Sequence, residues 1–367
     1  MHTVASVIDF LEQFASPSLA ADWDNVGLLL GDRASPVRKI LTCLTVTPDC
    51  AAEAIELGAQ LIVTHHPILF RGAKRLTGDT AEGRILLSLA RAGVAVYSPH
   101  TAFDNTIGGI NDSLAGRLGL KDLQPLVAEE GPRQCKLVVF VPDADLAKVS
   151  EAVFAAGAGN IGQYSQCSFR LDGTGTFFGS DATNPTVGQR GRREEVREWR
   201  LEMVCPEEVV EAVIVAMRTA HSYEEPAFDV YPLRPGKSRE GVGRVGRLPY
   251  PQTLEDFGRR VRAALSCGPV QLVGEMGRAV ERVAIVCGAG GELLSEAVRA
   301  RADVFLTGEM RFHDYLTAQT REVALCLPGH YATERFALEE LADRLKRHFP
   351  DLDVAASSRE SDPVNWV

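Results

Sequence analysis

Three strand-like segments of this chain end in side chains that bind metal ions. The apolar run LIVT is followed at once by His65 and His66, and the run VAVYSPH is followed by Asp104. Farther along, ALCLPG leads into His330, and Glu334 follows four residues later in a helical pattern. Imidazole and carboxylate groups gathered at several strand ends are typical of a metal site in an α/β protein.

Each pair of residues has a simpler interpretation when it is taken alone. A histidine and a glutamate four residues apart often form a helix-surface or capping contact, and adjacent histidines at a strand end can be satisfied by backbone groups. The combination is more informative, because coincidence would have to act at three strand ends. We therefore favour a metal site that uses all of these side chains.

The adjacent histidines suggest that the site holds two ions. Neighbouring side chains on a regular strand point to opposite faces, but Pro67 favours a turn directly after His65 and His66. Two rings that diverge from one turn are suited to two different ions. A pair of ions about 3.5 to 4 Å apart needs a bridging carboxylate, for which Asp104 and Glu334 are the candidates. We expect Zn²⁺, Mn²⁺, Fe²⁺ or Co²⁺, and the ligand types do not choose among them.

The eight cysteines predict no thiolate metal site. They occur singly, none lies in a C-x-x-C pair, and several stand within apolar runs such as ILTCLTV. This distribution is typical of small buried core residues in a reducing compartment. The metal ligands are therefore expected to be nitrogen and oxygen atoms.

Two other side chains are candidates for substrate binding or for supporting the ligands. His100, in SPHT, could orient Asp104, bind a substrate or only pack, and Glu309 ends the strand-like run DVFLTGE. Either could act as a proton shuttle by its position, but the sequence identifies no catalytic acid or base. The segment 288–291, Gly-Ala-Gly-Gly between a strand and a helix, is a weak indication of phosphate binding.

Composition limits the classes of function. With 367 residues, 45% of them hydrophobic, the chain can bury a large core, and more than one domain is expected. The formal net charge of −10 argues against a broad nucleic-acid surface, which would need clustered Lys and Arg. No apolar run reaches the roughly 20 residues that span a bilayer, and the N-terminal segment has no signal-peptide pattern. We expect a soluble, cytoplasmic protein.

The order of strand-like and helical patterns predicts an α/β fold in three consecutive parts. Strand-like and helical runs alternate in residues 1–130 and again in residues 241–367, as in mostly parallel sheets covered by helices on both faces. All five predicted ligands lie in these two lobes. The lobes would pack as one discontinuous core, with the ligands at the carboxyl ends of the strands.

The intervening segment, residues 131–240, has a different order. KLVVFVP, a helical run, the strand pair SQCSFRLDG and GTFFG, then REWRLEMVC, a second helical run and FDVYPL approximate a β-α-β-β-α-β, ferredoxin-like module. The Gly-, Pro- and Arg-rich stretch 233–251 is predicted to be the linker that returns to the core.

Several of these motifs together resemble a known family. WDNVGLLLGD, LIVTHHPILFRG, SPHTAFDN, TGEMRFHD and PGHYATER look like the Nif-three-like family, whose members are widely named GTP cyclohydrolase I type 2 homologues. The interrupted order resembles its bacterial subgroup, in which a domain similar to PII signalling and CutA-like proteins is inserted mid-chain. HSYEEPAFDVYPL fits that inserted domain.

The resemblance implies a dinuclear site at His65, His66, Asp104, His330 and Glu334, and a toroidal homohexamer with the sites facing an internal cavity. Our leading hypothesis is a metal-dependent hydrolase acting on a nucleotide or related heterocycle, with ring opening of GTP as the named reaction. The alternative is a metal-binding regulatory or scaffold protein whose insert senses a small ligand.

Overall fold

The computed structural model describes residues 1–365 and divides the chain into two compact units. The first unit combines residues 1–129 with the chain from residue 239 onward, and the second comprises residues 130–238. Every predicted metal ligand belongs to the first unit.

A five-stranded sheet forms one half of the first unit. Its strands, in spatial order, are β17 (Asp353–Ala356), β4 (Lys39–Cys43), β5 (Leu61–Thr64), β6 (Ala95–Ser98) and β2 (Gly27–Leu30). The first four are parallel, and β2 is antiparallel at the edge. Strands β4, β5 and β6 are almost entirely buried, which agrees with the continuous apolar runs that predicted them.

A six-stranded sheet forms the other half. Its spatial order is β13 (Gln271–Val273), β16 (Ala324–Leu327), β15 (Val304–Thr307), β14 (Ala279–Val286), β12 (Lys237–Thr253) and β7 (Lys121–Glu130). The central strands β14, β15 and β16 are parallel to one another. Strand β13 pairs antiparallel with β16, and β12 pairs antiparallel with β14. The mostly parallel arrangement expected for both sheets therefore holds for the central strands of each, whereas β2, β12 and β13 run antiparallel to their neighbours.

Helices cover these sheets, and a small two-stranded ribbon of β1 (His2–Thr3) and β3 (Pro36–Val37) lies at the N-terminus. The helices of the first unit are α1 (Val4–Phe14), α2 (Pro48–Glu56), α3 (Ala81–Ala92), α4 (His100–Asn105), α5 (Ile110–Arg117), α8 (Leu254–Leu265), α9 (Leu294–Arg299), α10 (Phe312–Thr320), α11 (His330–Glu334) and α12 (Phe336–His348).

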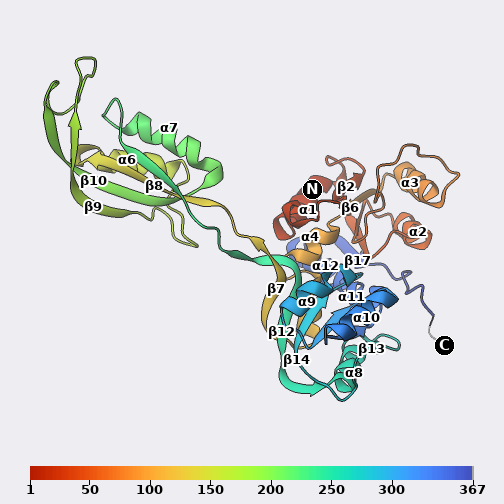
Figure 1. Cartoon of the computed structure of the whole chain (residues 1–367). Helices are drawn as coiled ribbons and strands as arrows, with labels where there is room; N and C mark the ends of the chain where they lie inside the picture. The colour runs from red at the N-terminus through yellow and green to blue at the C-terminus, as the bar shows by residue number, and fades with distance from the viewer. Residues whose placement is uncertain (366–367) are drawn as a thin grey trace. The chain divides into compact units, whose positions relative to one another are not determined.

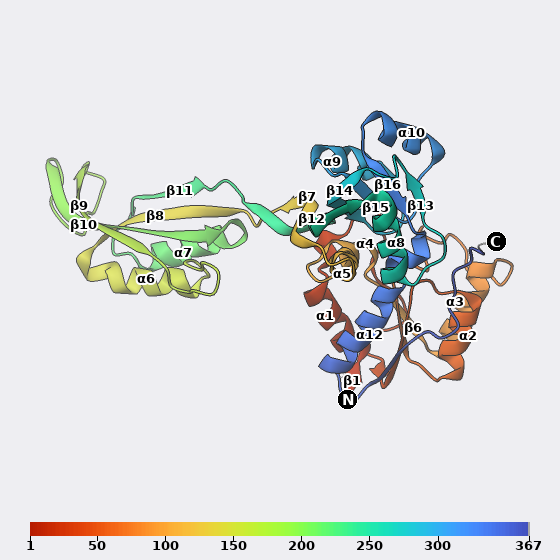
Figure 2. The ribbon, with the colours of Figure 1, turned by 90° about the horizontal axis from the view of Figure 1, so that it is seen from below.

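Figure 2 shows α1 and α12 on one side of the five-stranded sheet and α2 and α3 on the other. Alternate strand residues divide between the two faces: Leu61 and Val63 join the core under α1 and α12, and Ile62 joins the core under α2 and α3.

The stretch predicted to be a return linker is a strand instead. Residues 237–253 form β12, which lies between β7 and β14 in the sheet (Figure 1). The glycines of β12 make the strand hard to recognise in the sequence, but they leave room for neighbouring groups that pack closely against it. A Cβ at Gly246 would lie 2.7 Å from Leu123 Cδ2, and one at Gly243 would lie 2.6 Å from the Ile285 carbonyl oxygen. The glycines therefore allow neighbouring groups to approach β12 closely.

The last strand of each predicted lobe binds the halves of the first unit together. Strand β7, which precedes the insert, joins the six-stranded sheet, and β17, near the C-terminus, joins the five-stranded sheet beside β4. Helix α12 packs on both β4 and β17. Each sheet therefore contains strands from both predicted lobes, and both sheets contribute to one shared core.

The second unit is a four-stranded antiparallel sheet with two helices. The elements are β8 (Gln134–Pro142), α6 (Leu146–Ala155), β9 (Phe169–Phe178), β10 (Arg193–Pro206), α7 (Val210–Ala220) and β11 (Phe228–Pro232), and the sheet order is β11-β8-β10-β9. The two stretches predicted as a strand pair, SQCSFRLDG and GTFFG, overlap a single strand, β9. The Gly173 and Gly175 positions do not turn the chain but continue its pairing with β10.

All eight cysteines are free thiols, and six of them are buried. Among the residues that the structure describes, no helix combines the length and the apolar character needed to cross a bilayer.

Candidate metal centre

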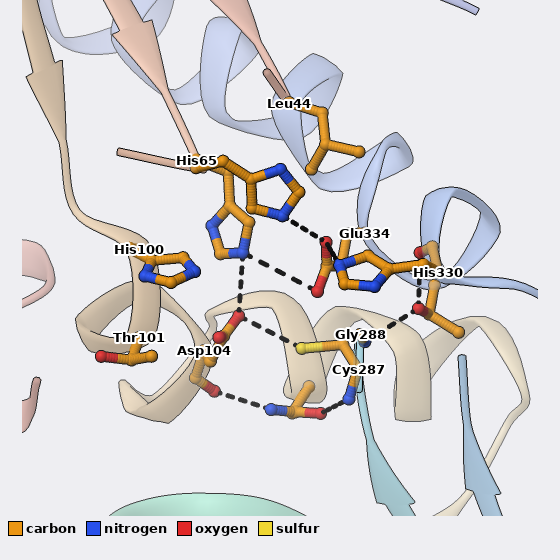
Figure 3. Close-up of polar contacts among 12 residues, drawn as sticks. Leu44, His65, His100, Thr101, Asp104, Cys287, Gly288, His330 and Glu334 are labelled. Atoms are coloured by element: carbon orange, nitrogen blue, oxygen red, sulfur yellow. Dashed lines mark hydrogen bonds and ion pairs between the residues drawn. The ribbon is translucent and has the colours of Figure 1, made fainter. Parts of the chain in front are cut away.

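The five predicted ligands meet where strands of both sheets end. His65 and His66 directly follow β5, and Asp104 lies in α4, which follows β6. His330 and Glu334 are the first and last residues of α11, which follows β16. Because residues four apart share one helix face, His330 Nε2 lies 3.1 Å from Glu334 Oε2 (Figure 3).

The Glu334 carboxylate stands at the centre of the cluster. Its Oε2 atom is 3.2 Å from His66 Nε2, and its Oε1 atom is 3.9 Å from His65 Nε2. Burial raises the pKa of Glu334, but hydrogen bonds from His330 and His66 outweigh burial and hold that pKa well below its usual range. A buried, ionised carboxylate that faces three imidazoles has the position expected of a bridging ligand.

The His65 ring supports the presence of an ion most directly. The residue is fully buried, and neither ring nitrogen has a hydrogen-bond partner. Its Nε2 atom lies 3.6 Å from Asp104 Oδ1 and 3.9 Å from Glu334 Oε1, which is too far for hydrogen bonds. When two ligand atoms each lie about 2.1 Å from one tetrahedral ion, the distance between the two atoms is about 3.4 Å, close to the distances found here. These residues therefore fit a divalent ion, and burial keeps the pKa of His65 low, so that the ring is neutral and able to coordinate.

Asp104 shows the electrostatic cost of this cluster without a cation. Burial, followed by repulsion from Glu334, raises the pKa of Asp104 to about 7. The Cys287 thiol donates to Asp104 Oδ1 at 3.1 Å, and Asn111 donates to the Asp104 carbonyl oxygen while it accepts from the Cys287 backbone N–H. The Asp104 carboxylate, 17% exposed, and the buried Glu334 carboxylate both face His65 Nε2, and a positive ion between them would stabilise both.

The outward-facing nitrogens of two imidazoles are held by neighbours. The Thr45 hydroxyl lies 2.7 Å from His66 Nδ1, and Glu309 Oε1 lies 3.0 Å from His330 Nδ1. Burial lowers the pKa of His330, but Glu334 and Glu309 outweigh it and raise that pKa to about 9. Partners of this kind orient metal-binding histidines, so Glu309 acts on the cluster through His330.

His100 is held in a strained position beside the cluster. Its φ is +28°, and its Nδ1 atom lies 2.7 Å from Asp24 Oδ1. Burial raises the pKa of Asp24, but hydrogen bonds from His100 and Thr101 lower it to about 2. Ligand atoms of His65, His66 and His100 lie within 4.8 Å of one another, as do those of His66, His330 and Glu334. The cluster thus contains two overlapping groups that could each hold an ion.

Asp24 and Cys287 were not among the predicted site residues. Asp24 lies in the WDNVG motif, whose only indication from sequence was the family resemblance, and Cys287 looked like a core thiol at the end of an apolar run. Neither residue stands near a predicted ligand in the sequence. Only packing brings Asp24 to His100 and Cys287 to Asp104.

The glycine-rich turn after β14 makes room for the cluster. A Cβ at Gly288 would lie 2.2 Å from Glu334 Oε1. The Gly288 N–H donates to Thr333 and the Gly290 N–H donates to Thr307, so both groups are already used. Two of the four amides of the segment 288–291 are therefore occupied within the protein.

Comparison with known proteins identifies the family. The model of the DUF34/NIF3 family (NGG1p interacting factor 3) matches residues 2–363, nearly the whole chain. The chain belongs to the DUF34/NIF3 family. The family resemblance drawn from the motifs is thereby confirmed.

Relatives and solved structures agree with this assignment over their full lengths. A Halalkalibacterium halodurans DUF34/NIF3 relative named GTP cyclohydrolase 1 type 2 homolog is 39% identical and covers 99% of this chain and 98% of its own. A Bacillus subtilis protein of the same name is 35% identical, with 98% of each chain covered. The crystal structure of a Bacillus cereus protein related to NIF3 has a TM-score of 0.79 at 34% identity, and that of a Staphylococcus aureus protein has 0.87 at 28%, each covering 100% of this chain and 99% of the other.

Proposed function

We propose that this DUF34/NIF3 protein is a metal-dependent hydrolase with a dinuclear site. The ligands would be His65, His66, Asp104, His330 and Glu334, and the cofactors two divalent ions drawn from zinc, manganese, iron and cobalt. The observation that carries this proposal is the fully buried His65 ring, which has no hydrogen-bond partner and faces two carboxylates. A buried imidazole in this state is explained by coordination.

When bound, such ions supply Lewis acidity and bring the pKa of water toward neutrality, which suits hydrolysis. The protein's own contribution is to hold the ligands in place. Thr45 and Glu309 fix the His66 and His330 rings. Asp24 fixes His100, whose ring centroid lies 5.0 Å from that of His65. His100 remains a candidate for binding substrate or for supporting the ligands.

The substrate class we propose is a nucleotide or related heterocycle, in line with the name of the relatives. The test is to load the purified protein with each metal and assay turnover of ribonucleotides, ribonucleosides and free bases. Asp104→Ala should abolish turnover, and Asp343→Ala, at an exposed position of α12, should not change it. The absence of turnover across this panel at full metal occupancy would contradict the proposal.

We also propose a toroidal homohexamer, which rests on the family resemblance. Analytical ultracentrifugation of the metal-loaded protein should give a single species of about six chains, and a stable monomer would rule the hexamer out.

A regulatory or scaffold role is the second candidate. Residues 130–238 form a separate compact unit with their own core, and a cavity of about 670 Å³ lies in that unit between β9 and the loop that contains Thr183 and Val187. A PII/CutA-like insert that senses a small ligand there would regulate or recruit without taking part in chemistry.

A further inference from the structure

A second cavity, of about 580 Å³, opens directly beside the metal cluster. His66, Glu309 and His330 form part of its lining, so a molecule in this cavity would touch the residues that surround the proposed ions. The cavity therefore has the location of a substrate pocket for the proposed hydrolase.

The C-terminal segment forms one wall of this cavity and is firmly attached. Glu360 accepts hydrogen bonds from the Leu44 and Thr45 backbone N–H groups at 2.9 and 2.7 Å. Its carboxylate also forms an ion pair with Arg335 at 2.7 Å, and its side chain is 3% exposed. The charge of Glu360 is thus balanced within the protein, and this residue anchors the segment 360–364, which lines the cavity.

The charges left at the cavity surface are negative. Glu309 and Asp362 line it, and the Glu309 side chain is 63% exposed. Of the described residues that line the cavity, the basic ones are two imidazoles, His66 and His330, which both already face Glu334. Beyond the proposed ions, a phosphate chain that extends along this wall would meet these two carboxylates, with no guanidinium or ammonium group of this lining beside it.

The remaining lining suits an uncharged ring. Tyr315 donates to the Gln271 amide oxygen at 3.3 Å, and Tyr331 donates to the Glu360 carbonyl oxygen at 3.3 Å, so both phenol groups are held in place. Two fixed aromatic rings and an amide offer stacking faces and hydrogen bonds to a flat polar molecule.

We propose that this cavity binds an uncharged, hydrogen-bonding ring compound at the level of a nucleobase or nucleoside, and that it discriminates against nucleoside triphosphates. This inference rests on the proposed function, because it assigns the substrate class of the same site. It differs from the substrate that the name of the relatives suggests.

The experiment compares matched pairs. The four ribonucleosides and their triphosphates are titrated by calorimetry into metal-loaded protein that has been dialysed free of excess metal. Asp362→Lys reverses a charge in the wall without touching a proposed ligand. Asp343→Lys, the same change at an exposed position outside the cavity, is the control.

We expect at least one nucleoside to bind tenfold or more tightly than its triphosphate. Asp362→Lys should strengthen triphosphate binding at least fivefold relative to nucleoside binding, and Asp343→Lys should leave that ratio unchanged. Tighter binding of the triphosphates, no effect of Asp362→Lys on them, or no binding of any nucleoside would overturn the inference. Selective nucleoside binding without turnover would instead contradict the hydrolase and leave the binding assignment standing.

Discussion

At the scale of single residues, the uncoordinated His65 ring is expected to destabilise the fold. Its two ring nitrogens are buried and unpaired, and such groups each cost about 1–3 kcal/mol. His221, in the second unit, is also buried, but its ring nitrogens contact the Tyr223 N–H and the Phe140 carbonyl oxygen. The two histidines therefore form a natural pair for comparison.

We predict that His65→Leu stabilises the metal-free protein, because leucine of similar volume removes two unpaired polar atoms. The free energy of unfolding of the chelated protein should rise by about 1–3 kcal/mol, measured by denaturant titration. His221→Leu breaks two hydrogen bonds and should lower the stability of its own unit. Metal addition should stabilise the wild type more than His65→Leu. A chelated His65→Leu protein less stable than the wild type would show that the ring is satisfied without metal.

At the scale of elements, Glu53 joins α2 to the C-terminal segment. Its carboxylate accepts from the Ser358 N–H at 2.9 Å and from the Ser358 hydroxyl at 2.6 Å, and it also accepts from the Ser357 hydroxyl. Burial raises the pKa of Glu53, but these hydrogen bonds outweigh burial and lower it below its usual value. The ionised Glu53 carboxylate thus helps to hold the C-terminal segment, which forms one wall of the cavity, against α2.

This pKa shift predicts a loss of stability in acid. A carboxylate whose pKa is lowered by folding stabilises the protein above its unfolded pKa, about 4.3, and the contribution disappears as pH falls through the lower folded pKa. Glu53→Gln should therefore destabilise the protein by about 1–3 kcal/mol at pH 7 and by less near pH 3.5. Denaturant titrations at both values test this, with Glu82→Gln at an exposed position of α3 as the control. Equal destabilisation at both pH values would contradict the role given to the charge.

At the scale of the whole molecule, the candidate metal ligands and the insert belong to separate compact units. The chain leaves the first unit along β7 and returns along β12, which are neighbours in one sheet. The Gly131 N–H also donates to the Gly236 carbonyl oxygen at 2.8 Å, so the two crossing segments lie together. A short connection can therefore replace the insert.

We predict that a chain in which a Gly-Ser linker replaces residues 132–235 folds and keeps its metal. Elemental analysis should give the same number of ions per chain as the full-length protein, and calorimetry should show the loss of the insert's own transition. A chain that fails to bind metal would indicate that the insert is required to assemble the site. Retained metal with altered oligomeric state or ligand response would favour the regulatory role.

The sequence by itself determined the buried central strands and which side chains are available to the site. Continuous apolar runs define β4, β5, β6, β14, β15 and β16, and the ligands are found at the ends of three such strands because their positions are local properties of the chain. The four-residue spacing of His330 and Glu334 likewise requires only one turn of helix.

Tertiary structure decided what these residues do together. The exchange of β7 and β17 between the sheets, the use of a glycine-rich stretch as β12, and the pairing of His100 with Asp24 all depend on contacts between distant segments. Gly246 suits its position in β12 because it leaves space for the Leu123 side chain. The pKa of Asp24 is low because the His100 imidazole packs against it. Such properties belong to neighbours in space, and no local pattern of residues encodes which neighbours those are.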